Sequence, residues 1–155
     1  MTDEEQQLAS QLVQQLAATW PQWSARLREQ EQRFATHEIV ELSIPVPSQR
    51  DHALRFAIRG PREIEVHYDD SQEPGPAEKL FVWGEGDPAA DGVGAVVEFT
   101  KLLVRGEVVV VREQMAWWAR LLRRKEADST LRFVDRETAA RQAARWQCVY
   151  TWKSA

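Results

Sequence analysis

The stretch LRFAIRGPREIEVHY, residues 54–68, decides the fold. Apolar side chains occupy every second position in each half, and Gly60-Pro61 separates the two halves. A period of two predicts strands with one buried and one exposed face, and the Gly-Pro pair predicts a tight turn between them. Residues 40–46 show the same alternation. The sequence therefore predicts an antiparallel meander of three strands.

Residues 1–34 are predicted to be helical. Leu8, Leu12, Leu16 and Trp20 recur every four residues, which places them on one face of a helix. Pro21 lacks a backbone N–H, so the helix must kink there or a second helix must begin.

The remaining elements follow the first three strands. Residues 80–83 are predicted as a short strand or an apolar plug, and residues 91–105 as a second long helix. Further strands are expected at 108–111, 131–134 and 148–152, with a helix at 136–146 capped by Asp135. Residues 114–126 fit either a helix or a hairpin arm. Strands cluster early and do not alternate strictly with helices, which favours an α+β class.

The predicted architecture is one domain spanning residues 1–155. Its helical segment is residues 1–34, and residues 38–155 supply an antiparallel meander sheet with further helices packed on one face. The chain has 155 residues, of which 43% are hydrophobic and 28% charged, as in a single globular domain. No apolar run approaches the ~20 residues of a membrane span. The acidic N-terminus and a single cysteine favour a cytoplasmic protein.

Charge is spread unevenly along the chain. Residues 1–100 carry a net charge of −10 and residues 101–155 a net charge of +6. The strongest acidic run lies within residues 69–91, which we interpret as a projecting loop. Such a run is either a solvated surface or a site that attracts a basic partner. Trp83 could anchor that partner, because tryptophan is enriched at binding hot spots. The candidate partner-binding residues are Asp69, Asp70, Glu73, Glu78, Trp83, Glu85, Asp87 and Asp91.

Enzymatic chemistry has one candidate. Glu65, His67 and Asp69 share one strand face, where a histidine beside carboxylates could act as a general base or bind a metal. His37 and His52 stand alone and are expected to be exposed or to cap an element. No recognisable nucleotide-binding or nucleophile motif is present, so we expect no cofactor, no metal and no catalytic set.

A nucleic-acid hypothesis rests on residues 117–125. Trp117 and Trp118 are followed by four basic residues, and aromatic rings stack on bases while cations contact phosphates. The alternative is an amphipathic helix with core tryptophans and a basic solvated face. The sequence pI of about 5.5 argues against a dedicated nucleic-acid binder.

Several of these features resemble a group of small cytosolic bacterial domains. They are the segment from Glu38 to Tyr68, the acidic stretch after it, the helix near residues 95–104 and the strand at 108–111. Some such domains accompany polymorphic toxins as immunity proteins. They often carry a Trp-His-x-His-Phe-like cluster after the third strand, where this chain has DDSQE at 69–73. The resemblance implies a toxin as the protein partner.

The leading hypothesis is a non-enzymatic protein-binding module of the immunity or antitoxin type. It would occlude a basic toxin through the acidic loop, with Trp83 as an apolar anchor. One alternative is a small-ligand-binding protein or enzyme that uses His67 and Asp69 in a pocket between sheet and helices. The other is a nucleic-acid-binding or regulatory module that uses Trp117 to Lys125. The sequence leaves the partner's identity and the oligomeric state open.

Overall fold

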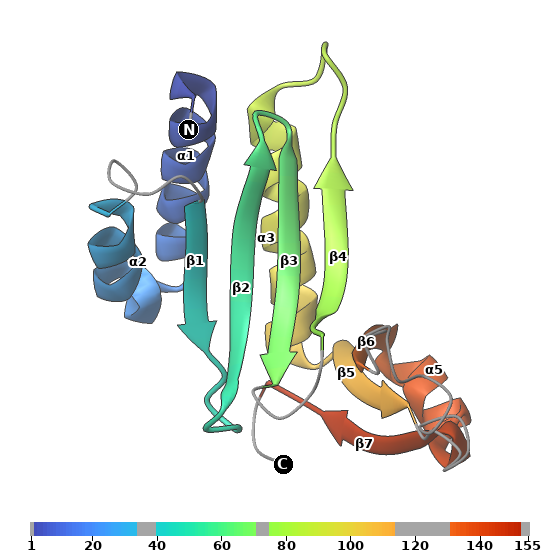
Figure 1. The fold of residues 1–155 in the computed structure, drawn as a ribbon. Coiled ribbons are helices and arrows are strands. Elements are labelled where there is room, and N and C mark those ends of the chain that lie inside the picture. Colours follow the sequence, from blue (N-terminus) through green and yellow to red (C-terminus); the bar gives the residue numbers. More distant parts are fainter. Residues whose placement is uncertain (1, 34–39, 71–74, 114–130, 153–155) are drawn as a thin grey trace. The chain divides into compact units, whose positions relative to one another are not determined.

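The structure is a computed structural model that describes residues 2–33, 40–70, 75–113 and 131–152 (Figure 1). It has the predicted α+β fold with an antiparallel meander sheet, and a second antiparallel sheet that was not predicted. Contacts divide the chain into two compact units. The first unit contains residues 1–44, 54–67 and 79–101, and the second unit contains residues 45–53, 68–78 and 102–155.

The N-terminal helices belong to the first unit. Helix α1 (Asp3–Thr19) starts with a capping box, in which the Thr2 hydroxyl accepts the Glu5 N–H at 3.2 Å and the Glu5 carboxylate accepts the Thr2 N–H at 2.7 Å. The break predicted at Pro21 is confirmed, because a short 3-10 turn (Pro21–Trp23) separates α1 from α2 (Ser24–Glu31). The predicted apolar stripe of α1 is buried.

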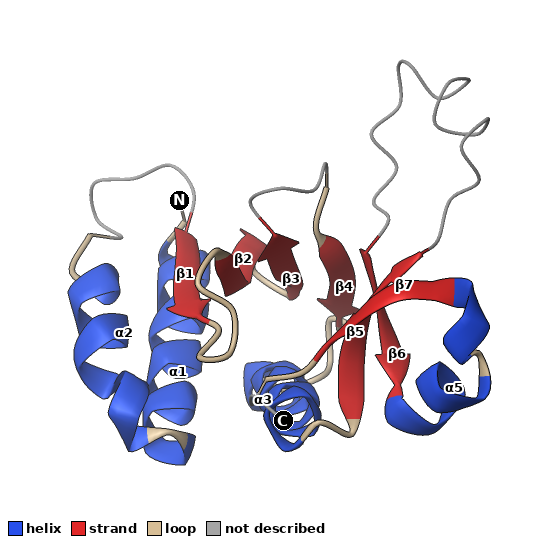
Figure 2. Cartoon of the chain, turned by 90° about the horizontal axis from the view of Figure 1, so that it is seen from below, coloured by secondary structure: helices blue, strands red, loops and turns tan. Residues whose placement is uncertain are grey.

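The larger sheet contains the predicted meander and a fourth strand. Its order is β1 (Val40–Pro45), β2 (His52–Gly60), β3 (Glu63–Asp70) and β4 (Ala77–Val82). In the first unit, helices α1, α2 and α3 (Ala89–Arg105) cover one face, and none of the described helices of this unit lies on the other face (Figure 2). The side chains turned toward these helices are the predicted apolar set: Leu42, Ile44, Leu54, Phe56, Ile58, Ile64 and Val66.

Helix α2 protects the outer edge of β1. The Gln30 side-chain amide donates to the Ser43 carbonyl at 3.0 Å, and its oxygen accepts the Ser43 N–H at 2.6 Å. Arg26 Nε donates to the same carbonyl at 2.9 Å. Edge strands carry backbone groups that no neighbour satisfies, and here one glutamine occupies the place of a neighbouring strand.

The last three strands form a separate sheet in the second unit. Strand β5 (Val108–Glu113) lies between β6 (Leu131–Asp135) and β7 (Trp146–Tyr150). The valines of β5 at 109–111 are all buried, as the unbroken β-branched run predicted. The predicted cap is also confirmed, since the Asp135 carboxylate accepts the Thr138 N–H at 2.8 Å where α5 (Arg136–Arg141) begins. Residues 114–126, predicted as helix or hairpin arm, lie outside the described residues.

We expect Gln30→Ala to lower the free energy of unfolding by about 1–3 kcal/mol, because it removes the partner of the Ser43 N–H and leaves the Ser43 carbonyl with Arg26 alone. Urea denaturation measures this change. Gln14→Ala is the control, since Gln14 is exposed on α1. Equal stability of the two variants would show that Gln30 does not protect the β1 edge.

Candidate functional site

The acidic run at residues 69–91 is not a single projecting loop, which corrects the sequence interpretation. Strand β3 continues through Asp70, β4 begins at Ala77 and α3 begins at Ala89. Asp69, Asp70 and Glu78 belong to the second unit. Trp83, Glu85, Asp87 and Asp91 belong to the first unit. Glu73 lies outside the part of the chain that the structure describes.

Asp70, predicted as a surface carboxylate, is buried at 6% exposure. Its Oδ2 accepts a hydrogen bond from Arg112 Nη2 at 2.5 Å and lies 3.3 Å from His52 Nε2. A buried carboxylate requires such partners, because an unpaired charge in the interior is very costly. Asp70 is therefore unsuited to meeting a partner protein.

These contacts belong to a buried cluster in the second unit, which we call the His52 network. His52, which was expected to be exposed or to cap an element, is 8% exposed, and its Nδ1 lies 2.8 Å from the Tyr68 hydroxyl. The ring of Tyr150 packs against His52 at 4.7 Å between centroids. The members of the network are His52, Tyr68, Asp70, Arg112 and Tyr150.

Both imidazole nitrogens of His52 have polar neighbours when the ring is neutral. In that state Tyr68 O–H donates to Nδ1, and Nε2–H faces the Asp70 carboxylate. Burial lowers the pKa of His52, with the charge of Arg112 acting in the same direction and those of Asp70 and Asp51 opposing it. Both nitrogens of this ring, which is 8% exposed, therefore face side chains of the network.

The two tyrosines of the network are also held in their neutral form. Burial raises the pKa of Tyr68 well above its usual value, and the charge of Asp70 adds to the shift. Burial raises the pKa of Tyr150 to about 12, although Arg112 opposes this shift. This cluster was not predicted, because its residues come from four strands that lie far apart in the sequence. One signal in the sequence was available. Tyr68 and Asp70 continue the every-second-residue pattern of Ile64 and Val66, which places all four side chains on the buried face of the strand.

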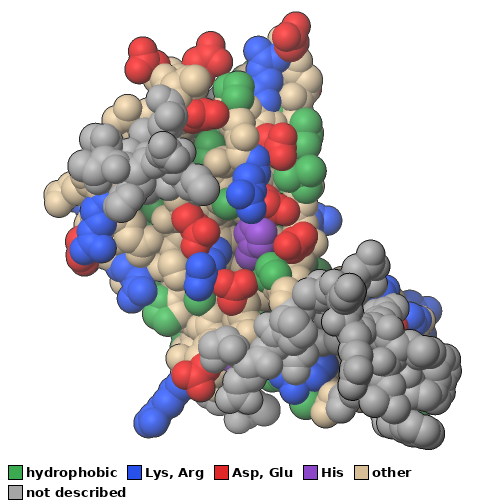
Figure 3. Space-filling view, in the orientation of Figure 1, with side chains coloured by type: hydrophobic (Ala, Val, Ile, Leu, Met, Phe, Trp, Pro, Cys, Tyr) green, Lys and Arg blue, Asp and Glu red, His purple; other side chains and the backbone are tan. Residues whose placement is uncertain are grey.

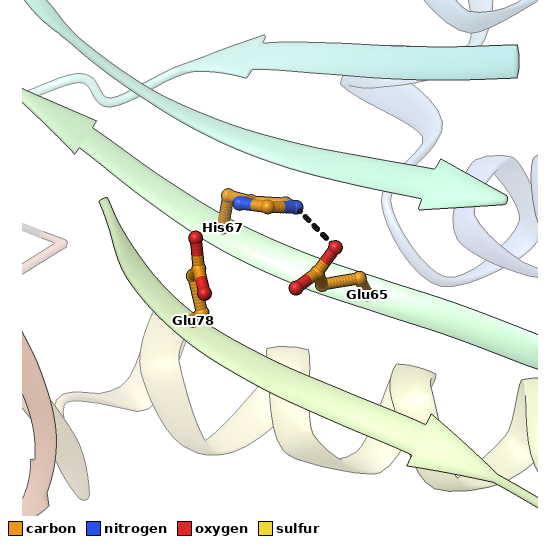
Figure 4. A group of neighbouring side chains, drawn as sticks. All are labelled: Glu65, His67 and Glu78. Atoms are coloured by element: carbon orange, nitrogen blue, oxygen red, sulfur yellow. Dashed lines mark ion pairs between the residues drawn. The ribbon is translucent and has the colours of Figure 1, made fainter. Parts of the chain in front are cut away.

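Glu65 and His67 lie on β3 and point to the face opposite the helices (Figure 4). His67 Nε2 is 3.1 Å from Glu65 Oε2, and Arg59 Nε donates to the same oxygen at 2.7 Å. Burial alone would raise the pKa of Glu65, but the hydrogen bond from Arg59 and the charge of His67 outweigh it and lower this pKa. Glu78, also drawn in Figure 4, belongs to the second unit.

The geometry of Glu65 and His67 differs from the predicted alternative site. A carboxylate held ionised by an arginine is a poor proton donor at neutral pH. The alternative also required a pocket between sheet and helices, whereas these two side chains lie on the sheet's other face. Asp69, the third member of that hypothesis, is in the second unit.

Trp83 follows β4 and is half-buried against α3. A Cβ on Gly92 would lie 2.3 Å from Trp83 Cε3, so the indole rests directly on the helix backbone where only glycine fits. The Trp83 N–H donates to the Arg62 carbonyl at 3.3 Å. The indole helps to line a surface cavity of about 210 Å³ together with Leu8, Gln11, Arg62 and Asp87.

Glu85 and Asp87 in the turn between β4 and α3, and Asp91 in the first turn of α3, carry three exposed carboxylates. Asp87 Oδ2 accepts the Gly84 N–H at 3.1 Å, which stabilises the turn. Among the residues that the structure describes, none of these three carboxylates forms an ion pair. Elsewhere on the first unit, acids do form such pairs, as in Glu41–Arg55 and Glu65–Arg59.

Two exposed apolar side chains precede this turn on β4. Leu80 is 52% exposed and Val82 is 65% exposed. Hydrophobic side chains gather along the right-hand margin of the sheet in Figure 3, where β4 lies, while acidic and basic side chains alternate over the middle of this face. We call Leu80, Val82, Trp83, Glu85, Asp87 and Asp91 the β4–α3 surface.

No protein-family model, curated protein or solved structure matches the chain. Among the described helices, none has the length and apolar character needed to cross a bilayer. The proposed nucleic-acid segment, Trp117 to Lys125, lies outside the described residues.

We expect Gly92→Ala and Gly94→Ala to change stability in opposite directions. A Cβ at residue 94 meets no atom within 4 Å, so alanine should raise the free energy of unfolding by about 0.5–1 kcal/mol. A Cβ at residue 92 must displace the Trp83 ring, so alanine there should lower the free energy of unfolding by about 1–3 kcal/mol. Urea denaturation measures both. Equal stabilisation by the two alanines would contradict the position of Trp83 on α3.

We expect the protein to lose stability as the pH falls below 6.5, the ordinary pKa of histidine. The unfolded chain binds a proton at His52 there, while the native state resists protonation until its lower pKa is reached. His52→Asn should lower stability at pH 7 and reduce this pH dependence. Denaturation from pH 7 to pH 5, with NMR titration of the His52 ring, measures both effects. A native His52 pKa at or above 6.5 would contradict the account.

Proposed function

We propose that this chain is a non-enzymatic protein-binding module, and that it acts as an immunity-type inhibitor of a basic toxin in the bacterial cytoplasm. The observation that carries the proposal is the β4–α3 surface. There, exposed carboxylates without ion pairs among the described residues directly follow exposed Leu80 and Val82 and the half-buried indole of Trp83.

The chemistry of this surface suits a cationic protein partner. Carboxylates that are not neutralised by neighbouring cations produce a negative potential, which accelerates the approach of a positively charged protein. Apolar side chains beside them then lose water on contact and slow the departure of the partner. Polar and charged groups surrounding an aromatic anchor are common in binding sites between proteins.

The proposal places the contact on a smaller set of residues than the whole acidic run. Asp70 is excluded by its burial and its ion pair with Arg112. Glu85 and Asp91 are the best residues for a charge test, since Asp87 also holds the turn. Inhibition would follow if the bound module covers the positive cleft of the toxin.

The test uses the protein encoded by the gene beside that of this chain, because immunity proteins are expected to neutralise a neighbouring toxin. We expect a complex whose association rate falls by about tenfold in Glu85→Lys/Asp91→Lys, with a weaker dependence on salt. Stopped-flow fluorescence at low and high salt measures these rates.

The matched control is Glu29→Lys/Glu98→Lys, which changes the net charge equally at two exposed acids of the first unit. Its association rate should stay close to that of the wild type at high salt and fall less at low salt. Absence of a complex with the neighbouring gene's product would reject the inhibitor proposal. Equal slowing by both variants would reject the β4–α3 surface as the docking site.

A further inference from the structure

We propose that the outer edge of β4 binds an extended, lysine- or arginine-bearing segment of the partner protein as an additional antiparallel strand. This inference rests on the proposed function and specifies how the partner docks. Strand addition of this kind gives affinity through main-chain hydrogen bonds and selectivity through alternate side chains.

Strand β4 is the last strand of its sheet in the part of the chain that the structure describes. Figure 1 shows it at the margin of the sheet, opposite β1. The two margins differ chemically. Gln30 and Arg26 satisfy the outward backbone groups of Ser43 on β1, and no equivalent side chain is described for Leu80 or Val82 on β4.

The orientation of the β4 backbone follows from one hydrogen bond. The Trp83 N–H donates to Arg62, just before β3, so residue 83 turns its backbone groups toward that strand. In an antiparallel ladder, successive residues turn their N–H and C=O groups to opposite sides. The backbone N–H and C=O groups of Lys79 and Phe81 therefore point toward β3. Those of Leu80 and Val82 point away from β3, toward the open edge of the sheet.

The side chains of the same residues are exposed as well. Phe81 packs on Phe99 of α3 at 5.6 Å between ring centroids, and Lys79 Nζ lies 5.1 Å from the Phe99 centroid. The strand's lysine thus covers the helix side and leaves the apolar side chains of Leu80 and Val82 unprotected. Proteins normally protect such an edge with charge, proline or a covering segment, because it otherwise recruits another strand.

Charge selects the occupant. Glu85, Asp87 and Asp91 follow the open edge directly, with no ion pair to another described residue, so a strand carrying cations is attracted and one carrying anions is repelled. Apolar residues that alternate with the cations would contact Leu80 and Val82. A second copy of this chain would bring the same carboxylates to the edge and is electrostatically the poorer occupant.

The first experiment uses a nine-residue peptide of alternating lysine and valine, capped at both ends, as the probe. Amide hydrogen exchange is followed by NMR on the whole chain. We expect the exchange of the Leu80 and Val82 amides to slow by about tenfold with peptide, and that of Phe81, which already faces β3, to change little. The same peptide with glutamate in place of lysine should give no protection.

Two variants test the edge itself. Val82→Pro removes an outward N–H at a position where an edge strand tolerates proline, and should weaken peptide binding by about tenfold or more. Leu80→Lys/Val82→Lys keeps every backbone group but places cations on the edge, and should abolish binding of the lysine peptide. Val149→Lys is the control, because Val149 is exposed on β7 in the second unit. Circular dichroism checks that each variant folds.

The outcomes separate the two proposals. Protection restricted to Leu80 and Val82, lost in the lysine variant, supports strand addition. Unprotected amides in a complex with the neighbouring gene's product would overturn strand addition and leave the proposed function standing. Concentration-dependent protection without any peptide would show that a second copy occupies the edge, which also overturns the inference. Peptide protection without that complex would reject only the inhibitor role.

Discussion

Backbone groups at the margin of a sheet must find partners outside it, and this constraint shapes the first unit. On β1 the constraint is met within the chain, by a glutamine of α2 that bonds both the N–H and the C=O of Ser43. On β4 the corresponding groups of Leu80 and Val82 have no such cover among the described residues. The edge of β1 is therefore closed by the protein's own helix, and the edge of β4 is the better candidate for binding a partner.

The second unit follows a related rule for charge. Among the described residues of the acidic run, Asp70 is buried, and Arg112, His52 and Tyr150 lie around it. The hydrogen bond from the Tyr68 hydroxyl to His52 Nδ1 requires a neutral ring, because a protonated imidazole has no acceptor nitrogen. The contacts of this network join strands of the second unit, whereas the carboxylates of the β4–α3 surface are exposed to solvent.

Local sequence patterns predicted most helices and strands, but they did not predict which distant segments pair with one another. Period-two alternation predicted β2 and β3, period-four apolar residues predicted α1, and Pro21 predicted its end, since each depends only on near neighbours. The separate sheet around β5 and the ion pair between Asp70 and Arg112 join residues about forty positions apart. Sequence spacing alone carries no information on which partners meet at that distance.

The candidate site shows the same division. Glu85, Asp87, Asp91 and Trp83 were named as candidate binding residues from composition and position, whereas Leu80 and Val82 were not. These two residues continue the apolar sequence of a strand, so their pattern is equally typical of a buried face. Only sheet order shows that β4 has a single neighbour among the described strands and that its alternate residues remain outside the core.

In the proposed complex, residues 79–91 would combine two contributions to binding that act at different stages. Charge on the β4–α3 turn acts at long range and sets how fast a cationic partner arrives, while backbone pairing and apolar contact act only after arrival and set how long it stays. Main-chain hydrogen bonding at the β4 edge would by itself bind almost any extended chain. Electrostatic attraction by itself would not fix the register of a bound strand. In the proposed complex, the acidic residues that follow the strand edge would favour cationic strands over other extended chains.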